Sequence, residues 1–280
     1  VQQQTHQNIG LQTIMLIVAL FAIYSLFSLI SIVAAILKYH PYQLDKHDET
    51  IQRSGGVISH QQDALAIKRI QLVQVQQPAI ARLFNRWTLY FKQVKGHEVE
   101  QKTKQHMLVP SVKSTEIESL LASIPQLSGG ASALPNSYKP IHINWLTKRI
   151  VLPLFPAIVL TIVGYYGHHS LEFFEFTWFA ATMIMLAIYI RYKQWGYVVA
   201  DKVIWQHSGF FGQQWKRVAF EKVQHVKITQ TKSQKHAQLA YVEIGLASGN
   251  VVFPYIPTSV AQQIVAQSLN ATVNNNQNWI

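Results

Sequence analysis

Three long apolar stretches interrupt an otherwise polar chain. Residues 14–37 carry no charged side chain, and a helix of that length, rising about 1.5 Å per residue, crosses a hydrocarbon core of roughly 30 Å. Two further stretches, 146–166 and 173–190, are separated by a loop that is too short to form a domain. The pattern therefore predicts a transmembrane helix at 14–37 and a transmembrane hairpin at 146–190.

A signal peptide is the alternative interpretation of the first stretch. The residues before it contain no Lys or Arg, and no small-residue cleavage site follows promptly, which argues against that alternative. We therefore expect residues 1–13 to be an extracytoplasmic stub. Because the second polar segment follows a hairpin, we also expect that the first one did, with the outer helix of that hairpin lying upstream.

The segments 38–125 and 191–280 contain short runs that alternate apolar and polar positions. Alternation with period two is typical of half-buried strands. In each segment a series of such runs is followed by a short helical pattern, at 115–124 and at 259–269. Residues 126–145 are rich in Pro, Gly and Ser and form the expected linker. The predicted fold class is an α+β membrane protein with transmembrane helices and two antiparallel β sandwich or barrel domains, each closed by a C-terminal helix.

These two segments repeat one another. The run KRIQLVQVQQ at 68–77 returns as EKVQHVKITQ at 221–230, so that Gln71 and Gln77 match Gln224 and Gln230. Within each strand the two glutamines share a face with two apolar residues, because side chains alternate along a strand. The glutamines could fix the pairing of neighbouring strands, or they could line a polar groove for a peptide or a lipid headgroup.

The first copy carries four family motifs within residues 42–91. They are Arg53-Ser54-Gly55-Gly56, Arg69-Ile70-Gln71, Gln77-Pro78 and Arg82-Leu83-Phe84. The run resembles the bacterial pleckstrin-homology-like (PH-like, type 2) domain of membrane-flanked proteins of the YdbT type. The resemblance implies a β sandwich or partly open barrel capped by a helix, together with membrane anchoring, and it implies no reaction. The second copy reads TKSQKHAQL where the first reads PAIARLFNR, so it has diverged at this turn.

Composition and charge support a membrane protein. Only 13% of the residues are charged, against roughly 25% in soluble domains. The net charge of +11 favours anionic partners such as lipid headgroups or nucleic acid. Lys and Arg are absent from 1–37 and 150–190, so the positive-inside rule predicts a multi-pass protein of the bacterial inner membrane with both PH-like domains cytoplasmic. The residues expected where the hairpin meets the inner surface are Lys148, Arg149, Arg191 and Lys193, with Trp145, Tyr189, Tyr192 and Trp195.

Basic side chains of the PH-like domains are candidates for contact with anionic lipid or with a partner. Each such charge near a membrane surface contributes about 1 kcal/mol to binding of anionic lipid. The excess of Lys and Arg that cytoplasmic segments carry under the positive-inside rule would give the same pattern. Arg53 and His207, which lie at the first strand turn of each copy, are too few for a phosphate clamp, so we do not expect phosphoinositide recognition. The candidate residues are Arg53, Arg69, Arg82, Arg86, Lys216, Arg217 and Lys222.

We predict no catalytic residue, cofactor or metal site. The chain contains no cysteine, which excludes disulfides, Cys-based zinc sites and Cys nucleophiles. The motifs HExxH, GxSxG, GxxxxGK[ST] and GxGxxG are also absent. His168, His169 and Glu172 could hold zinc or copper only with a distant further ligand, and none is obvious. Nucleic-acid binding would rest on net charge alone, so we expect none.

The expected function is binding or scaffolding at the cytoplasmic face of the membrane. The expected partners are the lipid bilayer and either a membrane protein, such as a smaller protein with the same domain, or a second copy of this chain. The alternative is a subunit of a membrane transport or export complex. The apolar stretches contain few charged residues, whereas transport paths usually require more intramembrane polarity.

Overall fold

A computed structural model describes residues 2–47, 49–57, 61–94, 106–122, 124, 134–168 and 170–274. The chain forms two compact units, residues 1–66 and 67–280, which we call the N-terminal and C-terminal units and describe separately. The alternating pattern also predicts a strand at 57–60, most of which lies outside the described residues, as does His169.

The N-terminal unit consists of one long helix and a small antiparallel sheet. Helix α1 (Gln2–Tyr39) includes most of the stretch that we expected to form a separate stub. Strands β1 (Tyr42–His47), β2 (Thr50–Gly55) and β3 (Gln61–Ala66) pair in that order. Ile51 lies opposite Leu65 in the register of β2 and β3, and both side chains are buried. Directly opposite residues share a face of the sheet, so this face of the unit is its apolar one.

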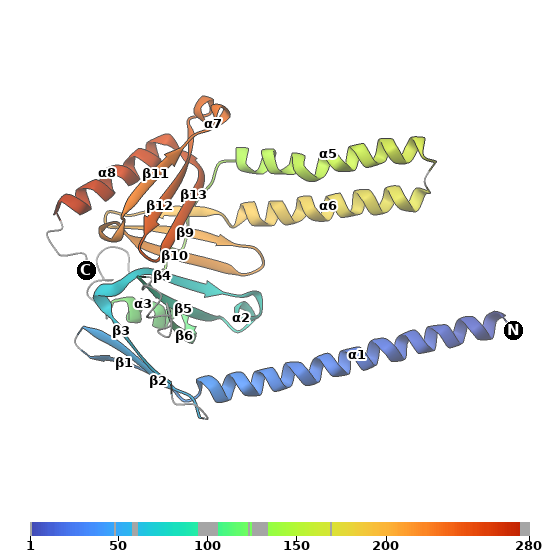
Figure 1. The fold of residues 1–280 in the computed structure, drawn as a ribbon, viewed down its shortest axis with the longest axis horizontal. Helices are drawn as coiled ribbons and strands as arrows, with labels where there is room; N and C mark the ends of the chain where they lie inside the picture. Colours follow the sequence, from blue (N-terminus) through green and yellow to red (C-terminus); the bar gives the residue numbers. More distant parts are fainter. Residues whose placement is uncertain are drawn as a thin grey trace. The chain divides into compact units, whose positions relative to one another are not determined.

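The C-terminal unit contains the predicted helical hairpin. Helices α5 (Asn144–Tyr166) and α6 (Leu171–Lys193) lie side by side (Figure 1). Among the described residues, these are the two helices that are long and apolar enough to cross a membrane, judged by length and composition. The apolar part of α1, Val18–Ala34, is shorter. Glu172 lies in the first turn of α6 and Arg191 in its last turn, which complements the helix dipole at both ends.

The remaining elements of the C-terminal unit follow the two copies of the repeat. The first copy forms a 3-10 turn (Ile67–Arg69), β4 (Ile70–Gln77), α2 (Ala79–Leu83), β5 (Arg86–Gln93), β6 (His106–Lys113) and α3 (Ser114–Ala122). Next come β7 (Lys139–Pro140), β8 (Gly196–Val199), β9 (Val203–Gly209), β10 (Gln213–Ala219) and a second 3-10 turn (Phe220–Lys222). The second copy ends with β11 (His225–Thr229), α7 (Lys232–His236), β12 (Leu239–Leu246), β13 (Gly249–Pro257) and α8 (Thr258–Asn274).

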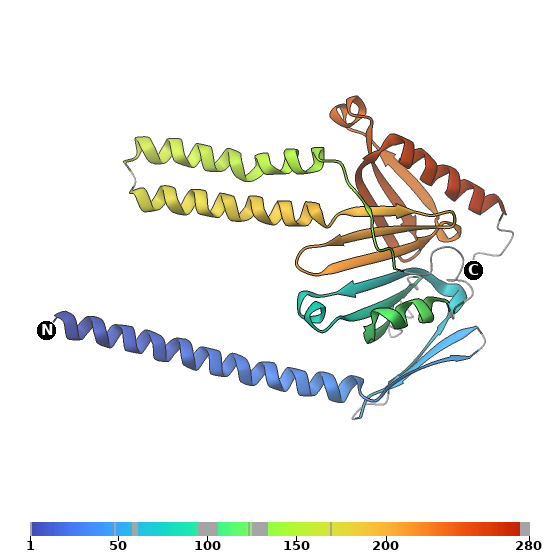
Figure 2. The same ribbon diagram turned by 180° about the vertical axis from the view of Figure 1, so that it is seen from behind.

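One seven-stranded sheet runs through both copies. Its order is β6-β5-β4-β10-β9-β8-β7, and β11-β12-β13 form a separate sheet. The joint between the copies is antiparallel pairing of β4 with β10, in which Val75 lies opposite Trp215 and Val73 opposite Arg217. Figure 2 shows these two strands side by side from behind. The sequence predicted two separate domains. In the structure the glutamine-rich strand β4 of the first copy also joins the two copies, through its pairing with β10. We call this joint the seam.

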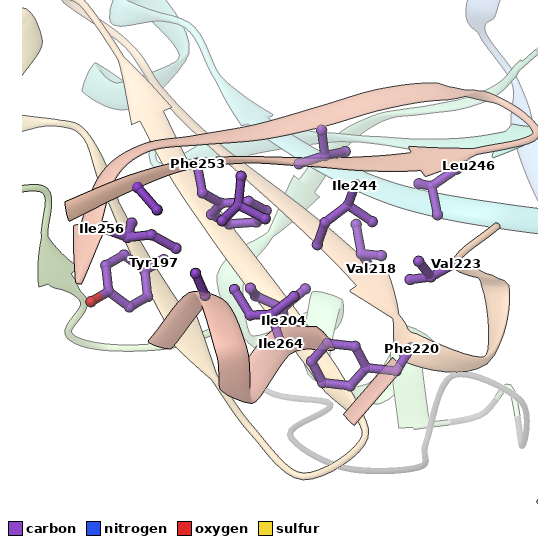
Figure 3. Packing of buried hydrophobic residues seen from close by; sticks show 14 of the residues in the cluster. Tyr197, Ile204, Val218, Phe220, Val223, Ile244, Leu246, Phe253, Ile256 and Ile264 are labelled. Carbon is purple, nitrogen blue, oxygen red and sulfur yellow. The ribbon is translucent and has the colours of Figure 1, made fainter. Parts of the chain in front are cut away.

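The core of the second copy lies between its two sheets and α8 (Figure 3). Ile204 and Val218 come from the seven-stranded sheet, Ile244 from β12 and Ile264 from α8, and none of the four is exposed to solvent. Leu72 of β4 belongs to the same cluster. The first copy therefore contributes an apolar side chain to the core of the second.

The repeat is preserved in the backbone. Asn85 and Gln238 both have left-handed φ values, of 48° and 56°, and they occupy the same position after α2 and α7. The pairing register shifts between Trp87 and Leu89 in the first copy, and between their counterparts Ala240 and Val242 in the second. The same residue spacing relates all these positions. Helices α2 and α7 are both present, so the turn that differs most in sequence keeps its conformation.

Candidate membrane-facing site

Aromatic and basic side chains surround the hairpin where it joins the sheet. The Trp145 and Tyr192 rings stack with centroids 6.3 Å apart, and the Arg149 guanidinium lies 4.1 Å from the Trp145 ring centroid. The Lys193 ammonium lies 5.6 Å from the Tyr189 centroid. Such pairs are typical of the membrane–water interface. We call this set the hairpin collar, and it comprises Trp145, Lys148, Arg149, Tyr189, Arg191, Tyr192, Lys193 and Trp195.

The hairpin collar is attached to the sheet by direct hydrogen bonds. The Tyr138 hydroxyl donates to the carbonyl of Lys193 over 2.8 Å, and the backbone N–H of Ile141 donates to the carbonyl of Trp195 over 3.3 Å. Ile141 and Trp145 are buried against each other. The base of the hairpin therefore has a fixed position on the seven-stranded sheet.

An aromatic stack continues from Tyr138 into the sheet. The Tyr138 ring lies on the His207 ring with centroids 4.3 Å apart and meets the edge of Trp215 at 5.8 Å. Trp215 in turn meets Trp205 edge to face at 6.2 Å. Burial lowers the pKa of His207 and raises the pKa of Tyr138. We call Tyr138, Trp205, His207 and Trp215 the aromatic stack.

The burial of His207 predicts a loss of stability in mild acid. Its folded pKa lies below the ordinary value of 6.5 because burial disfavours the imidazolium. The unfolded chain therefore binds the extra proton first, and stability falls as the pH drops from about 6.5 towards the folded pKa, by about 1.4 kcal/mol for each pKa unit between the two states. Thermal unfolding measured between pH 7.5 and 5.5 in detergent should follow this direction. The His207→Phe variant should have a flatter pH profile, and an unchanged profile would contradict the assignment.

Two turns of the C-terminal unit expose large apolar side chains. Phe210 and Phe211 lie in the turn between β9 and β10, where the Phe211 side chain is 65% exposed. Helix α2 and the residue after it expose Ile80, Leu83 and Phe84 by 74%, 84% and 70%. Clustered exposure of this kind indicates a surface that is covered in the functional state. We call these five residues the apolar tips.

The apolar tips are tied to the hairpin and to each other. The side chain of Gln194, which follows α6, donates to the carbonyl of Phe210. A Cβ on Gly212 would lie 2.6 Å from the carbonyl oxygen of Gln77 and 3.0 Å from the Cα of Pro78, so only glycine lets this turn approach the start of α2. Figures 1 and 2 both show α2 and the β9–β10 turn at the end of the sheet from which α5 and α6 extend.

The corresponding turn of the second copy is polar. Helix α7 is closed by a capping box, in which Thr231 Oγ1 accepts from the N–H of Gln234 and Gln234 Oε1 accepts from the N–H of Thr231. Its exposed residues include Lys232 and Lys235. The same backbone turn therefore presents apolar side chains in the first copy and basic ones in the second.

The basic residues predicted as contacts do not gather in one place. Arg82 lies on α2 among the apolar tips and is exposed, as is Arg69. Arg86, Lys216 and Lys222 are half-buried, and Lys222 donates to the carbonyl of Lys68 over 3.3 Å. Two members of the set are buried, which removes them from a lipid-facing surface. They are Arg53, which pairs with Asp63 at 2.5 Å, and Arg217, whose pKa burial lowers to about 10.

The repeated glutamines take part in strand pairing. Gln77 Oε1 accepts from Gln213 Nε2 over 2.6 Å, across the seam between β4 and β10. Its counterpart Gln230 donates to the carbonyl of Leu239 over 2.8 Å. These contacts favour the structural interpretation of the glutamines over a polar groove. No group of three His, Cys, Asp or Glu side chains within the described part of the chain is arranged to hold a metal ion.

Comparison with known proteins agrees with the repeat. The family model for the bacterial PH domain matches residues 7–124 and again 148–272. A Bacillus subtilis (strain 168) protein described as UPF0699 transmembrane protein YdbT is 22% identical over 254 residues, which cover 88% of this chain and 48% of that protein. The chain thus spans about half the length of this relative, and no solved structure matches it. On these matches, and on the two backbone copies described above, the chain belongs to the bacterial PH domain family.

Proposed function

We propose that this chain is a membrane-anchored binding protein whose PH-like domains act at the cytoplasmic surface of the bacterial inner membrane. In this arrangement α5 and α6 cross the bilayer, and the hairpin collar lies at the inner interface. The apolar tips enter the headgroup region beside it. The YdbT relative is described as a transmembrane protein, which supports the membrane association of this chain.

The observation that carries the proposal is the common location of the hairpin collar and the apolar tips. Gln194 connects the end of α6 to Phe210, and Gly212 connects that turn to α2. A hairpin that crosses the bilayer would therefore bring Phe211 and Phe84 to the lipid surface without a further conformational change. Basic residues of the collar, such as Arg149 and Lys193, favour the anionic inner leaflet.

Binding fits the hairpin better than transport does. The hydroxyls of Thr161 and Thr177 each donate to a carbonyl of their own helix, over 2.7 Å and 2.8 Å. A hydroxyl bonded in this way has no O–H donor left for a solute. Transport paths usually bring ionisable groups together inside the membrane.

Insertion of the apolar tips can be measured directly because the chain contains no cysteine. A bimane label on Phe84→Cys or Phe211→Cys, in the full chain in phosphatidylglycerol nanodiscs, should be quenched by lipids spin-labelled near the headgroup. Adding Leu83→Asp to the Phe84→Cys chain should remove most of its quenching, since burying one such side chain is worth about 1.5–3 kcal/mol.

Leu269→Cys provides the matched control. Leu269 is 61% exposed and lies in the second half of α8, which runs away from the hairpin in Figures 1 and 2. We expect no quenching at this position. Equal quenching at Phe84→Cys and Leu269→Cys, or none at either tip, would refute the membrane contact.

A further inference from the structure

The edge of β4 that joins the two copies has a counterpart in the second copy. β4 pairs with β5 on one edge and with β10 on the other. By the spacing of the repeat, β4 corresponds to β11, which pairs with β12 on one edge. No strand in the described part of the chain pairs with the other edge of β11. An open edge carries backbone N–H and C=O groups that can template a further strand.

The edge of β10 that pairs with β4 also has a counterpart, which lies in the N-terminal unit. β10 pairs with β9 and with β4, and the same repeat spacing relates it to β3. β3 pairs with β2, and its other edge has no strand partner among the described residues. Within the described residues, β4 and β10 are therefore paired through these edges, whereas the corresponding edges of β11 and β3 have no strand partner.

We propose that β11 of one molecule of this chain pairs with β3 of a second molecule, antiparallel and in the register that β4 and β10 use. In the internal joint Lys216 lies opposite Gln74. By the repeat spacing, Gln74 corresponds to Lys227 and Lys216 corresponds to Asp63. The proposed pairing therefore places Asp63 of one molecule opposite Lys227 of the other. Opposite charges that face each other directly across an antiparallel pair stabilise it.

The charges on the two edges select this occupant. A lysine on an open edge normally discourages pairing with other strands, but opposite an aspartate it favours that one partner. The side chain of Asp63 is 30% exposed and binds Arg53 at 2.5 Å. Because a carboxylate has acceptor sites on both oxygens, it can accept from Lys227 as well. Most of β11 is exposed, including Lys227 and Thr229, so its side chains leave room for a strand.

The pairing joins two different edges, β11 of one molecule and β3 of another. A single contact leaves one β11 and one β3 open in each dimer; if these also pair with each other, the dimer is closed and two-fold, and if they pair with further molecules, rings or longer arrays form. This inference goes beyond the proposed membrane contact and does not depend on it. The two are also tested by different residues, because none of the apolar tips lies on β3 or β11.

Disulfide cross-linking between two differently tagged full-length chains tests the pairing. One chain carries Lys227→Cys and the other Asp63→Cys, so that only contact between copies can join them. Mixed in mild detergent and oxidised, they should form a heterodimer that reductant dissolves. Because Asp63 also binds Arg53, the adjacent register pair, Val226→Cys with Ala64→Cys, provides a second cross-link that keeps this ion pair.

Gln62→Cys is the matched control for register. Gln62 is exposed and adjacent to Asp63, but it points to the other face of the sheet, so we expect little cross-linking to Lys227→Cys. Equal cross-linking of Gln62 and Asp63, or none from either register pair, would overturn the proposal. Cross-linking of Lys227→Cys in native membranes to a different protein, and not to Asp63→Cys, would also overturn the choice of a second copy as the occupant.

Self-association of the uncross-linked chain gives an independent readout. Lys227→Glu places two carboxylates opposite each other and should weaken association measured by analytical ultracentrifugation roughly tenfold, whereas Lys227→Arg should preserve it. A chain that is monomeric at every concentration, or that associates equally well with Glu at position 227, would contradict the pairing.

Discussion

Replacing Phe91 with alanine is expected to destabilise both copies of the PH-like domain, although Phe91 belongs to the first. Phe91 lies on β5 between Val73 of β4 and Met107 of β6 in the sheet register, and its side chain is fully buried. Truncating such a residue costs about 3–5 kcal/mol, a large share of the roughly 5–15 kcal/mol that stabilises a typical domain.

The loss should reach the second copy through the seam between β4 and β10. β4 contributes Leu72 to the core that includes Ile204 and Val218, and its outer edge holds β10 in the sheet. In the Phe91→Ala chain, hydrogen exchange followed by mass spectrometry should therefore become faster in β9 and β10 as well as in β4 and β5. Faster exchange restricted to β4, β5 and β6 would indicate two domains that unfold independently.

Phe84→Ala is the control for this experiment. The same side chain is removed, but the Phe84 side chain is 70% exposed. Its truncation should therefore change the free energy of unfolding by no more than about 0.5 kcal/mol. A comparable loss from both substitutions would mean that the effect is not due to core burial.

Local sequence patterns predicted the parts of the fold that depend on local physics. The hairpin follows from the length and hydropathy of two stretches, and the structure places its helices at Asn144–Tyr166 and Leu171–Lys193. The interfacial aromatic and basic residues follow from their position beside those stretches. Most strands follow from period-two alternation, because one face of each is buried and the other is solvated.

The seam between β4 and β10 could not be predicted in this way. Periodicity indicates which side chains share a face, but it does not identify the neighbouring strand. One signal was present in the sequence. β4 carries no charged residue on either face, whereas its counterpart β11 carries Lys227. Gln74 is buried on the face of β4 opposite Val73 and Val75, as expected for a strand covered on both faces, and this difference between the copies distinguishes a central strand from an edge strand.

The apolar tips were missed for a different reason. The sequence identified Arg82-Leu83-Phe84 as a family motif, but apolar residues in a soluble domain are normally assigned to the core. The surroundings of Leu83 are decided by the five-residue helix α2, which buries none of its side chains. The polar character of the corresponding turn in the second copy, with Lys232 and Lys235, was the available sign that this position faces outward.

Trp205→Ala should have the largest effect on the connection between the sheet and the hairpin. The Trp205 side chain has no exposed surface and meets Trp215 edge to face, so its removal should cost about 3–5 kcal/mol. Trp215 contacts Tyr138, and the Tyr138 hydroxyl is bonded to the carbonyl of Lys193. A cavity at Trp205 would therefore loosen the aromatic stack that seats the hairpin collar. Thermal unfolding in detergent should show the lower stability, and hydrogen exchange should become faster at the C-terminal end of α6.

Two comparisons distinguish a loosened attachment of the hairpin to the sheet from a general loss of stability. Trp205→Phe keeps an aromatic ring in the same space and should restore most of the stability and slow exchange at the end of α6. Trp178 lies on α6 and is 39% exposed. Trp178→Ala removes the same kind of side chain and should leave the sheet unchanged. If exchange near Lys193 rises in Trp178→Ala but not in Trp205→Ala, the hairpin is held by its own helix contacts. The opposite result would mean that the aromatic stack fixes the sheet on the hairpin, and hence that it determines whether the apolar tips can reach the lipid surface.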